Sequence, residues 1–440
     1  MEAAERKEHY LSAFSRLQRN GAADAPAWLA DLRQTAIDEF DRLGFPTTKN
    51  EDWKYTSVEP IVSVPFETAN GRALPLPPAA EIFARGFAES STNRLVFVNG
   101  AFSPELSSQN LPAGITAGSL ARALERDDQG VVERHLGRIA PRLHGFAALN
   151  TAFARDGALV WVRRGEALEE PLYVIFVAGA PARPVVAYPR NLFVFEENSS
   201  ARIVEVYVGA SENKYFENAV TEIVGQDQAQ IDHYRIQREG RGGAHVGVVA
   251  ARVGRHSNFT AHGVSLSGSL VRNDVRAALV GEGGECTLNG LYLAQDEEHV
   301  DNQTAIDHIA PHASSFELYK GILSGKGRAV FNGRITVHKA AQKTDARQTN
   351  KNLLLSGEAI VHTKPQLEIH ADDVKCSHGS TIGQADRDAL FYLRSRGLDV
   401  ESARSVLSYA FASEVVGRMK IAALRERLDD YLLTKFGGSR

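Results

Sequence analysis

The chain has only two cysteines, Cys286 and Cys376, among its 440 residues. Two cysteines are too few for a disulfide framework and are typical of a protein in a reducing compartment. Basic residues are not in excess either, because the formal net charge is −4, and this gives no reason to expect nucleic acid as a partner.

Long apolar segments are also missing. The best run, Leu172 to Ala178, is far shorter than the roughly 18 residues that a membrane span needs. The N-terminus is charged and lacks the apolar core of a signal peptide. With 43% hydrophobic and 24% charged residues, the chain has a globular composition. We therefore expect a soluble, cytoplasmic protein with no membrane partner.

Residues 1–155 are predicted to form a mostly helical domain with a linker and short strands. Apolar residues recur at helical spacing from Tyr10 to Leu17 and from Trp28 to Leu43. The Pro-rich stretch 65–78 is typical of a linker. Strand-like residues occupy 94–100, and helical spacing returns over 117–126 and 143–154.

Residues 156–383 are predicted to be β-structure with an internal repeat. From about Asn191, β-branched and aromatic runs begin at 201, 229, 257, 284 and 314. A period near 28 is short for a propeller blade of roughly 40–45 residues, and it suits one coil of a β-solenoid. The alternative is a β-sandwich with evenly spaced hairpins. Cys286 aligns with Phe259 and Phe316 in the repeats, which predicts that its side chain lies in the core.

Residues 384–440 are predicted to be a helical domain. Leu390, Phe391 and Leu393 mark a short helix that ends near Gly397. Asp399 or Ser402 is a candidate N-cap for the next helix. A third helix carries the apolar residues from 421 to 432.

Cys376 and His378 are the candidate site. Residues i and i+2 of a strand share a face and lie roughly 6.6 Å apart at Cα, so the pair can present a sulfur and an imidazole side by side. His370 and the acidic pair Asp372 and Asp373 are expected on an adjoining edge. One Cys and one His are too few for a metal centre, because structural zinc takes four protein ligands and iron–sulfur clusters usually take four cysteines. The pair is either half of a site shared with another chain or an ordinary part of a strand.

Other motifs give little support for catalysis. The chain has no Walker A motif, no strand-linked G-x-G-x-x-G and no G-x-S-x-G nucleophile elbow. Histidines gather in the second half, where scattered polar side chains on exposed strand faces are the simplest explanation. Eleven of the fourteen lie after residue 230: His233, His245, His256, His262, His299, His308, His312, His338, His362, His370 and His378.

Several motifs together resemble the SufB/SufD family of iron–sulfur cluster assembly proteins. The segment 50–56, Asn-Glu-Asp-Trp-Lys-Tyr-Thr, is similar to the SufD branch, and the sparse cysteines agree with that branch, because SufB-type chains are expected to carry more. The remaining motifs are 333–337, 344–346, 348–350, 352–356, 365–369, 373–379 and 392–397.

The resemblance implies a right-handed parallel β-helix between N-terminal and C-terminal helical domains. It implies a non-enzymatic scaffold subunit of the SUF complex that pairs with SufB through the β-helix, or with a second copy of itself. His378 would then lie at the interface and contribute to nascent cluster formation and iron acquisition. Cys376 would be a ligand, a sulfur relay or a packed strand residue.

The resemblance also implies that the C-terminal helices bind the SufC ATPase. No cofactor would be held stably by this chain alone, and iron or an iron–sulfur cluster would be shared transiently with SufB. The residues assigned to the SufC surface are Leu390, Tyr392, Leu393, Arg394, Arg396, Val406 and Phe411.

Two other functions are compatible with the predicted fold. A pure interaction scaffold without a metal role would tolerate loss of His378. A β-helix enzyme acting on polysaccharide would need a carboxylate cluster with basic partners on one solenoid face, together with a secretory signal.

Overall fold

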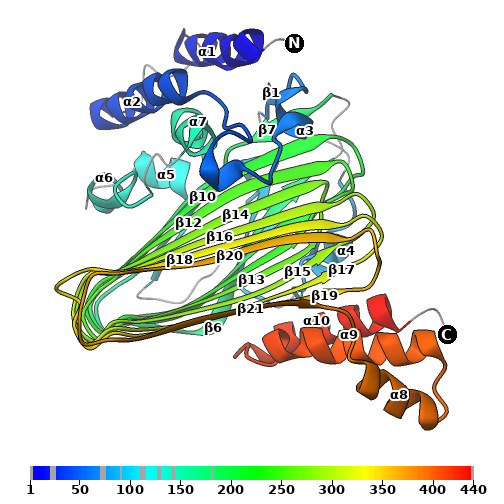
Figure 1. The fold of residues 1–440 in the computed structure, drawn as a ribbon. Helices are drawn as coiled ribbons and strands as arrows, with labels where there is room; N and C mark the ends of the chain where they lie inside the picture. Colours follow the sequence, from blue (N-terminus) through cyan, green and yellow to red (C-terminus); the bar gives the residue numbers. More distant parts are fainter. Residues whose placement is uncertain are drawn as a thin grey trace.

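The structure is a computed structural model that describes residues 3–19, 26–69, 76–89, 92–108, 115–125, 130–140, 144–179 and 183–437 (Figure 1). Helices dominate its N-terminal part, as predicted, and the two helices expected before Gly44 are confirmed as α1 and α2. Residues 70–75 of the predicted linker lie outside the described residues. The N-terminal elements are α1 (Ala3–Arg19), α2 (Ala27–Leu43), η2 (Glu51–Trp53), α3 (Glu59–Val62), β1 (Glu67–Thr68), α4 (Ala79–Arg85), β2 (Arg94–Val98), β3 (Ala101–Phe102), β4 (Ile115–Ser119), α5 (Leu120–Leu124), α6 (Val131–His135) and α7 (Gly145–Phe153).

The centre of the molecule is a β-solenoid whose long strands alternate between two facing sheets (Figure 1). Sheet A has the order β20-β18-β16-β14-β12-β10-β8-β5-β4, and sheet B has the order β21-β19-β17-β15-β13-β11-β9-β6-β2-β3. The strands are β5 (Ala158–Val162), β6 (Ala167–Ala178), β7 (Val185–Ala187), β8 (Arg190–Phe195), β9 (Ser200–Gly209), β10 (Tyr215–Gly225), β11 (Gln230–Arg238), β12 (Gly243–Val253), β13 (Asn258–Ser267), β14 (Leu270–Leu279), β15 (Glu285–Ala294), β16 (His299–His308), β17 (Ser314–Leu323), β18 (Arg328–Val337), β19 (Asp345–Leu354), β20 (Ile360–Ile369) and β21 (Lys375–Gly383).

Strands β5 to β20 in sheet A and β6 to β21 in sheet B pair in parallel with their neighbours. Each sheet thus contributes eight parallel strands, and one turn of the solenoid consists of one strand from each sheet. The predicted mainly β solenoid with flanking helices is confirmed. The sandwich of hairpins is wrong, because the chain crosses to the other sheet after each of these strands.

The structure corrects the phase of the predicted repeat. Strands β9, β11, β13, β15 and β17 begin at 200, 230, 258, 285 and 314, so their starts differ by 30, 28, 27 and 29 residues. Cys286 pairs with Phe259, as predicted, and is 1% exposed. Its partner on the next strand is Ser315, however, and Phe316 faces outward. The turns vary in length, which a constant period does not capture.

One feature of these turns is regular. The residue two places before each of six consecutive strands in sheet B has a positive φ, between 51° and 65°. This left-handed conformation lets the chain reverse direction in a short turn, and it favours Gly, Asn and His. His256 and His312 are therefore turn residues in this series, whose members are Asn198, Gln228, His256, Gly283, His312 and Lys343.

Inward-facing side chains form columns that run along the solenoid from strand to strand. Most columns are apolar, and each fully buried Val, Ile, Leu or Phe contributes about 1.5–3 kcal/mol to folding. One column in sheet B is mixed, and we call it the His378 column. Its register partners in order are Ile203, His233, Ala261, Leu288, Glu317, Gln348 and His378.

The segment 50–56 lies on the outer face of sheet A and reaches its last strand. Trp53 is buried over the guanidinium of Arg272, 3.7 Å from its ring centroid. Tyr55 stacks on His362 of β20 with ring centroids 4.0 Å apart. Glu51 pairs with Lys364 of the same strand. The motif that resembles the SufD branch therefore ties the N-terminal part to the C-terminal end of the solenoid.

The C-terminal helices α8 (Arg387–Ser395), α9 (Val400–Val416) and α10 (Ala422–Phe436) lie on the side opposite α1, α2 and α7 (Figure 1), whereas α4 lies on their own side, in the same apolar cluster. All three predicted helices are confirmed, and the carboxylate of Asp399 caps α9 by accepting from the Ser402 N–H. Val415 and Leu424 pack with Val206 of β9 in one apolar cluster. No helix in the described ranges is long and apolar enough to cross a membrane.

The helix predicted over 117–126 is wrong in its first half. Residues 115–119 form β4, which pairs antiparallel with β5, and the helix α5 occupies only 120–124. Local spacing did not reveal this distant pairing. Strand β2 extends sheet B beyond β6, and β4 extends sheet A beyond β5. The segment before residue 155 therefore contributes one edge strand or more to each sheet at the N-terminal end of the solenoid. The predicted domain boundaries stay predictions.

Candidate functional site

The solenoid ends in two edge strands, β20 in sheet A and β21 in sheet B. Among the described residues, neither strand has a ladder partner on its outer side. Ile369 of β20 and Ile382 of β21 are 42% and 48% exposed. Their register partners on the preceding strand of the same sheet are both buried. Unpaired strand edges with exposed apolar side chains are templates for pairing with another chain.

Cys376 and His378 lie on β21 and face the same side. Cys376 pairs in register with the buried Ala346, and His378 pairs with the buried Gln348. Both side chains therefore continue inward columns at the point where the solenoid opens. Cys376 is half-buried against the central core cluster, whereas His378 is exposed. The predicted side-by-side presentation of a sulfur and an imidazole is the arrangement found.

The thiol of Cys376 is not activated by its surroundings. Burial raises its pKa above the ordinary value, and the nearby carboxylate of Asp345 raises it further. The thiolate is the form that attacks electrophiles and binds metals. In this chain alone Cys376 is therefore a weaker nucleophile and ligand than an ordinary exposed cysteine.

The described residues contain no group of three or more His, Cys, Asp or Glu side chains arranged to hold a metal ion. In particular, His370, Asp372 and Asp373 do not complete a site with Cys376 and His378. Asp373 instead forms an ion pair with Lys343 in the preceding turn. The candidate site on β21 therefore presents one thiol and one imidazole.

Most other histidines in the second half have structural partners. His233 contacts Glu205 at 2.8 Å and His245 contacts Glu239 at 2.9 Å, all four side chains being buried. His308 contacts Ser315. Burial lowers the pKa of His308 to about 4 and of His262 to about 3. These histidines belong to the packing of the solenoid and its outer faces.

The predicted SufC-binding residues fall into two groups. Tyr392 is 56% exposed, and Arg394, Arg396 and Val406 are exposed as well, whereas Leu390 and Leu393 are half-buried. Phe411 is turned toward sheet B instead, since the ammonium of Lys320 lies 3.9 Å from its ring centroid. The open apolar surface of the tail is therefore formed by α8 and one face of α9, not by Phe411.

Phe391 and Leu398 belong to the same tail surface but were not assigned to it from the sequence. Phe391 is 73% exposed, the most exposed of the large hydrophobic residues described. A helix whose stripe includes Phe391, yet which buries no residue in this chain, lacks the partner that its pattern requires. Ile369 and Ile382 were missed for a related reason. Both face inward, and they are exposed only because the solenoid ends at their strands, which the sequence pattern does not reveal.

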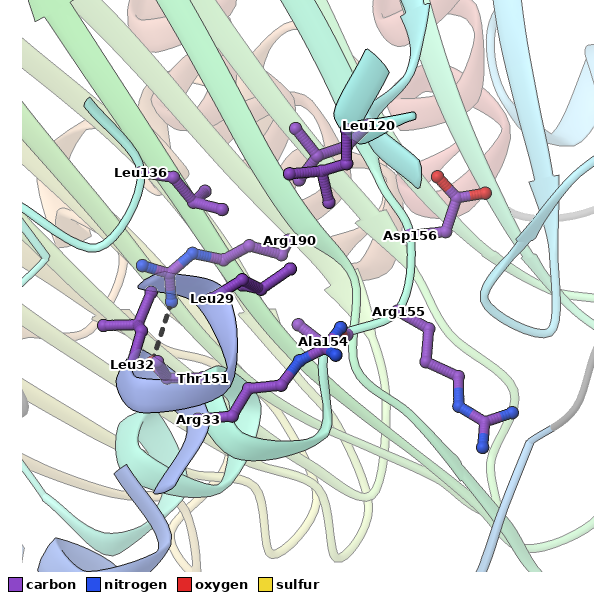
Figure 2. Close-up of a pocket in the computed structure, with 11 residues that line it drawn as sticks. Leu29, Leu32, Arg33, Leu120, Leu136, Thr151, Ala154, Arg155, Asp156 and Arg190 are labelled. Atoms are coloured by element: carbon purple, nitrogen blue, oxygen red, sulfur yellow. Dashed lines mark hydrogen bonds between the residues drawn. The ribbon is translucent and has the colours of Figure 1, made fainter. Parts of the chain in front are cut away.

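A pocket lies between helices α2, α5 and α7 and strand β8, in the N-terminal part of the chain (Figure 2). Its walls include Leu29, Leu32 and Leu120. The guanidinium of Arg190 at its base is bound to Thr151 at 3.0 Å and to Glu222 at 2.6 Å. Because this charge is already paired, the region is a packing gap around a buried ion pair.

Fold and site together define a class: a two-sheet β-solenoid with a thiol and an imidazole on its open edge and an uncovered helical tail. Residues 176–411 match the family described as SUF system FeS cluster assembly, SufBD core domain. Residues 4–174 match the SufBD protein N-terminal region. The chain belongs to the SufBD family of the SUF iron–sulfur cluster assembly system.

Curated relatives agree with this assignment. An iron–sulfur cluster assembly SufBD family protein of Synechocystis is 34% identical over 91% of this chain and 89% of its own. The iron–sulfur cluster assembly protein SufD of Escherichia coli is 32% identical over 90% of both chains. SufD of Bacillus subtilis is 25% identical over 96% of both.

Proposed function

We propose that this protein is a non-enzymatic scaffold subunit that holds part of a nascent iron–sulfur cluster, and the iron for it, at the open end of its solenoid. The cluster is cargo that is built there and passed on. His378 supplies an imidazole ligand, and Cys376 is its neighbour. The observation that carries the proposal is the incomplete ligand set on an unpaired edge strand. Two ligands that face an open edge require further ligands from a second chain.

The partner at this edge is a SufB-type chain, with a second copy of this protein as the competitor. Strand pairing along β20 or β21 would satisfy the free edges and cover Ile369 and Ile382. The same pairing would bring ligands of the partner next to His378. The family assignment supports this choice of partner, since relatives bear the name of the SUF assembly system.

The C-terminal tail binds a SufC-type ATPase. The exposed apolar residues Phe391, Tyr392, Leu398 and Val406 are anchors of the kind that dominate protein–protein interfaces, with Arg394 and Arg396 as nearby cations. This surface lies on α8 and one face of α9, on the side of the solenoid away from α1, α2 and α7 (Figure 1), whereas His378 lies on β21. ATPase binding and cluster assembly would therefore use different surfaces.

The proposal is tested by comparing the chain purified alone with the chain co-expressed with SufB-type and SufC-type subunits, both under anaerobic conditions. We expect iron and sulfide in the co-purified complex and none retained by the chain alone. The double variant Ile369→Lys and Ile382→Lys should lose the SufB-type subunit but keep the SufC-type subunit. The matched control is Leu433→Lys on α10, where the side chain is also 48% exposed.

Iron and sulfide in the isolated chain equal to those of the complex would contradict the shared-site proposal. Normal recovery of the SufB-type subunit with the double variant would contradict the edge as the pairing surface. Because the SufC-type subunit is scored in the same purification, loss of pairing and loss of folding give different results.

A further inference from the structure

Gln348 lies directly behind His378 in the His378 column and is buried, at 1% exposure. Its side chain reaches across the solenoid interior toward sheet A. A Cβ placed on Gly333 of β18 would lie 2.1 Å from the Gln348 Nε2 atom. Only glycine leaves room for the amide at this position. Gly333 and Gln348 both belong to the family-like motifs, and the proposed function assigns no role to either residue.

The orientation of the Gln348 amide is set by the residue on its other side. Nε2 donates to Oε2 of the buried Glu317 at 2.7 Å, and Glu317 precedes Gln348 in the same column. A carboxylate accepts and an amide nitrogen donates, so this contact distinguishes the two ends of the amide. The Oε1 atom of Gln348 is buried and has no hydrogen-bond partner among the described residues.

The polar neighbour of this acceptor on the next strand is His378. The two branches of an amide diverge, so turning Nε2 toward Glu317 directs Oε1 to the opposite side of the strand. His378 is the next member of the column on that side. Side chains of adjacent register partners lie about 5 Å apart at Cβ, which is within reach of a hydrogen bond from an imidazole N–H to an amide oxygen. A buried carbonyl oxygen without a donor is unfavourable.

We propose that Gln348 is a positioning residue for His378: anchored by Glu317, it accepts a hydrogen bond from one ring N–H and so fixes which ring nitrogen is free to bind metal. The inference rests on the proposed role of His378 as a ligand. Metal-binding histidines generally donate their other ring N–H to a carboxylate, a carbonyl or water, and this second contact sets the tautomer and the ring orientation. Glu317, Gln348 and His378 provide such a series along three consecutive strands.

The test is to measure the ratio of the two neutral His378 tautomers by ¹⁵N NMR of the full chain labelled at histidine, at pH 8 and without metal. The His378 signal is assigned by its loss in His378→Asn. The internal reference is His370, an exposed histidine whose ring makes no hydrogen bond to the described residues. Since one hydrogen bond is worth a modest net amount, the His378 ratio should differ from the His370 ratio by roughly 2- to 10-fold.

Gln348→Met keeps the side-chain length and removes the acceptor, so it should move the His378 ratio to that of His370. Asn352→Leu is the matched control, because it removes a buried amide from the same strand without touching the His378 column. It should leave the ratio unchanged. Equal ratios for His378 and His370 in the unmodified chain would overturn the proposal, even if Gln348→Met fails to fold.

This result is independent of cluster content. A tautomer bias that disappears in Gln348→Met, together with unchanged iron in a His378→Ala complex, would support the positioning contact and refute the proposed ligand role. The absence of a bias, together with iron loss in His378→Ala, would do the reverse.

Discussion

The same inward column carries a histidine in a closed turn and another at the open end. His233 on β11 is 2% exposed and contacts Glu205 at 2.8 Å, and strands flank it on both sides. His378 on β21 is exposed and has a strand on one side only. Since both residues face inward on one sheet, the repeat itself does not distinguish them. Their difference comes from where the solenoid stops.

The closed turns show what the interior requires of a polar side chain. Glu205 is fully buried and is held by His233, by both contacts of the Thr221 hydroxyl at 3.0 Å, and by Tyr207. Burial alone would raise the pKa of Glu205, but the His233 hydrogen bond, the positive charge of Arg235 and the Tyr207 hydroxyl bring it to about 2. Glu205 is thus retained inside the solenoid through hydrogen bonds from its neighbours. At the open end, the ring of His378 makes no hydrogen bond to a described residue, and the proposed partner there is another molecule.

The largest loss of unfolding free energy is expected from removing the acceptor of His233 in the closed part of the solenoid. Glu205→Leu would leave His233, Thr221 and Tyr207 without their acceptor, and removing one partner of a buried ionic group costs about 3–5 kcal/mol. Urea unfolding should show this loss of unfolding free energy. The control is Glu285→Leu, an exposed carboxylate in the same sheet, which should change stability by less than about 0.5 kcal/mol. Equal losses of unfolding free energy in the two variants would show that the buried contacts of Glu205 do not stabilise the fold more than an exposed carboxylate does.

Glu317 gives the next largest effect, and it depends on pH. Burial raises its pKa to about 7, above the value of about 4.3 in an unfolded chain. The folded chain therefore binds one more proton than the unfolded chain between those values. Its contribution to stability is complete below about pH 4 and is lost as the pH rises to about 7, by roughly 3–4 kcal/mol in total.

The variant Glu317→Gln should lack this contribution. The difference in unfolding free energy between the original chain and Glu317→Gln, measured by urea titration at pH 5, 6, 7 and 8, should change in favour of the variant as the pH rises. Taking the difference cancels the titration of the histidines. A difference that does not change with pH would show that the Glu317 carboxyl has an ordinary pKa.

A moderate effect is expected at the tail, which exposes its side chains as the open end does. Replacing both Phe391 and Tyr392 by Ala should weaken binding of a SufC-type subunit by about tenfold or more, since exposed aromatic anchors often account for at least 1 kcal/mol each. Isothermal titration calorimetry would measure it. Leu433→Ala on α10 is the control, and an equal loss of affinity in that variant would place the binding surface elsewhere.

The smallest effect on the chain itself is expected at His378. Because its side chain is exposed and makes no ion pair with the described residues, His378→Ala should change the unfolding free energy by less than about 0.5 kcal/mol. His233→Ala should cost several times more, because it leaves Glu205 buried without its imidazole partner. A large loss of stability in His378→Ala would mean that this residue belongs to the packing.

The sequence predicted the parts of this account that depend on short-range pattern. Helical spacing predicted α1, α2 and the three tail helices, and a histidine two residues after a cysteine gave the candidate site, which stays a prediction. The parts that failed depend on pairing between distant segments. Phe316 was placed one residue out of register because turn lengths vary, and β4 was mistaken for helix because its partner β5 lies about forty residues away.

The contacts of Gln348, behind His378, likewise depend on pairing between distant segments. Nothing in the sequence near Gln348 indicates that Glu317 orients it or that Gly333 makes room for it, since the three residues lie on different strands, in two sheets. Glycine at 333 and glutamine at 348 were noted as family-like motifs only. A physical reason for both appears once the register pairs Gln348 with His378 and the fold places Gly333 opposite the Gln348 amide.

The central claim is that the open end of the solenoid provides part of an iron–sulfur cluster site through His378. The most direct test is the iron and sulfide content, per complex, of His378→Ala co-expressed with SufB-type and SufC-type subunits and purified anaerobically, beside the matched variant His370→Ala. We expect His378→Ala to lose most of its iron and sulfide at unchanged subunit stoichiometry, and His370→Ala to keep both. Unchanged iron and sulfide in the intact His378→Ala complex would contradict the claim and leave a pure interaction scaffold.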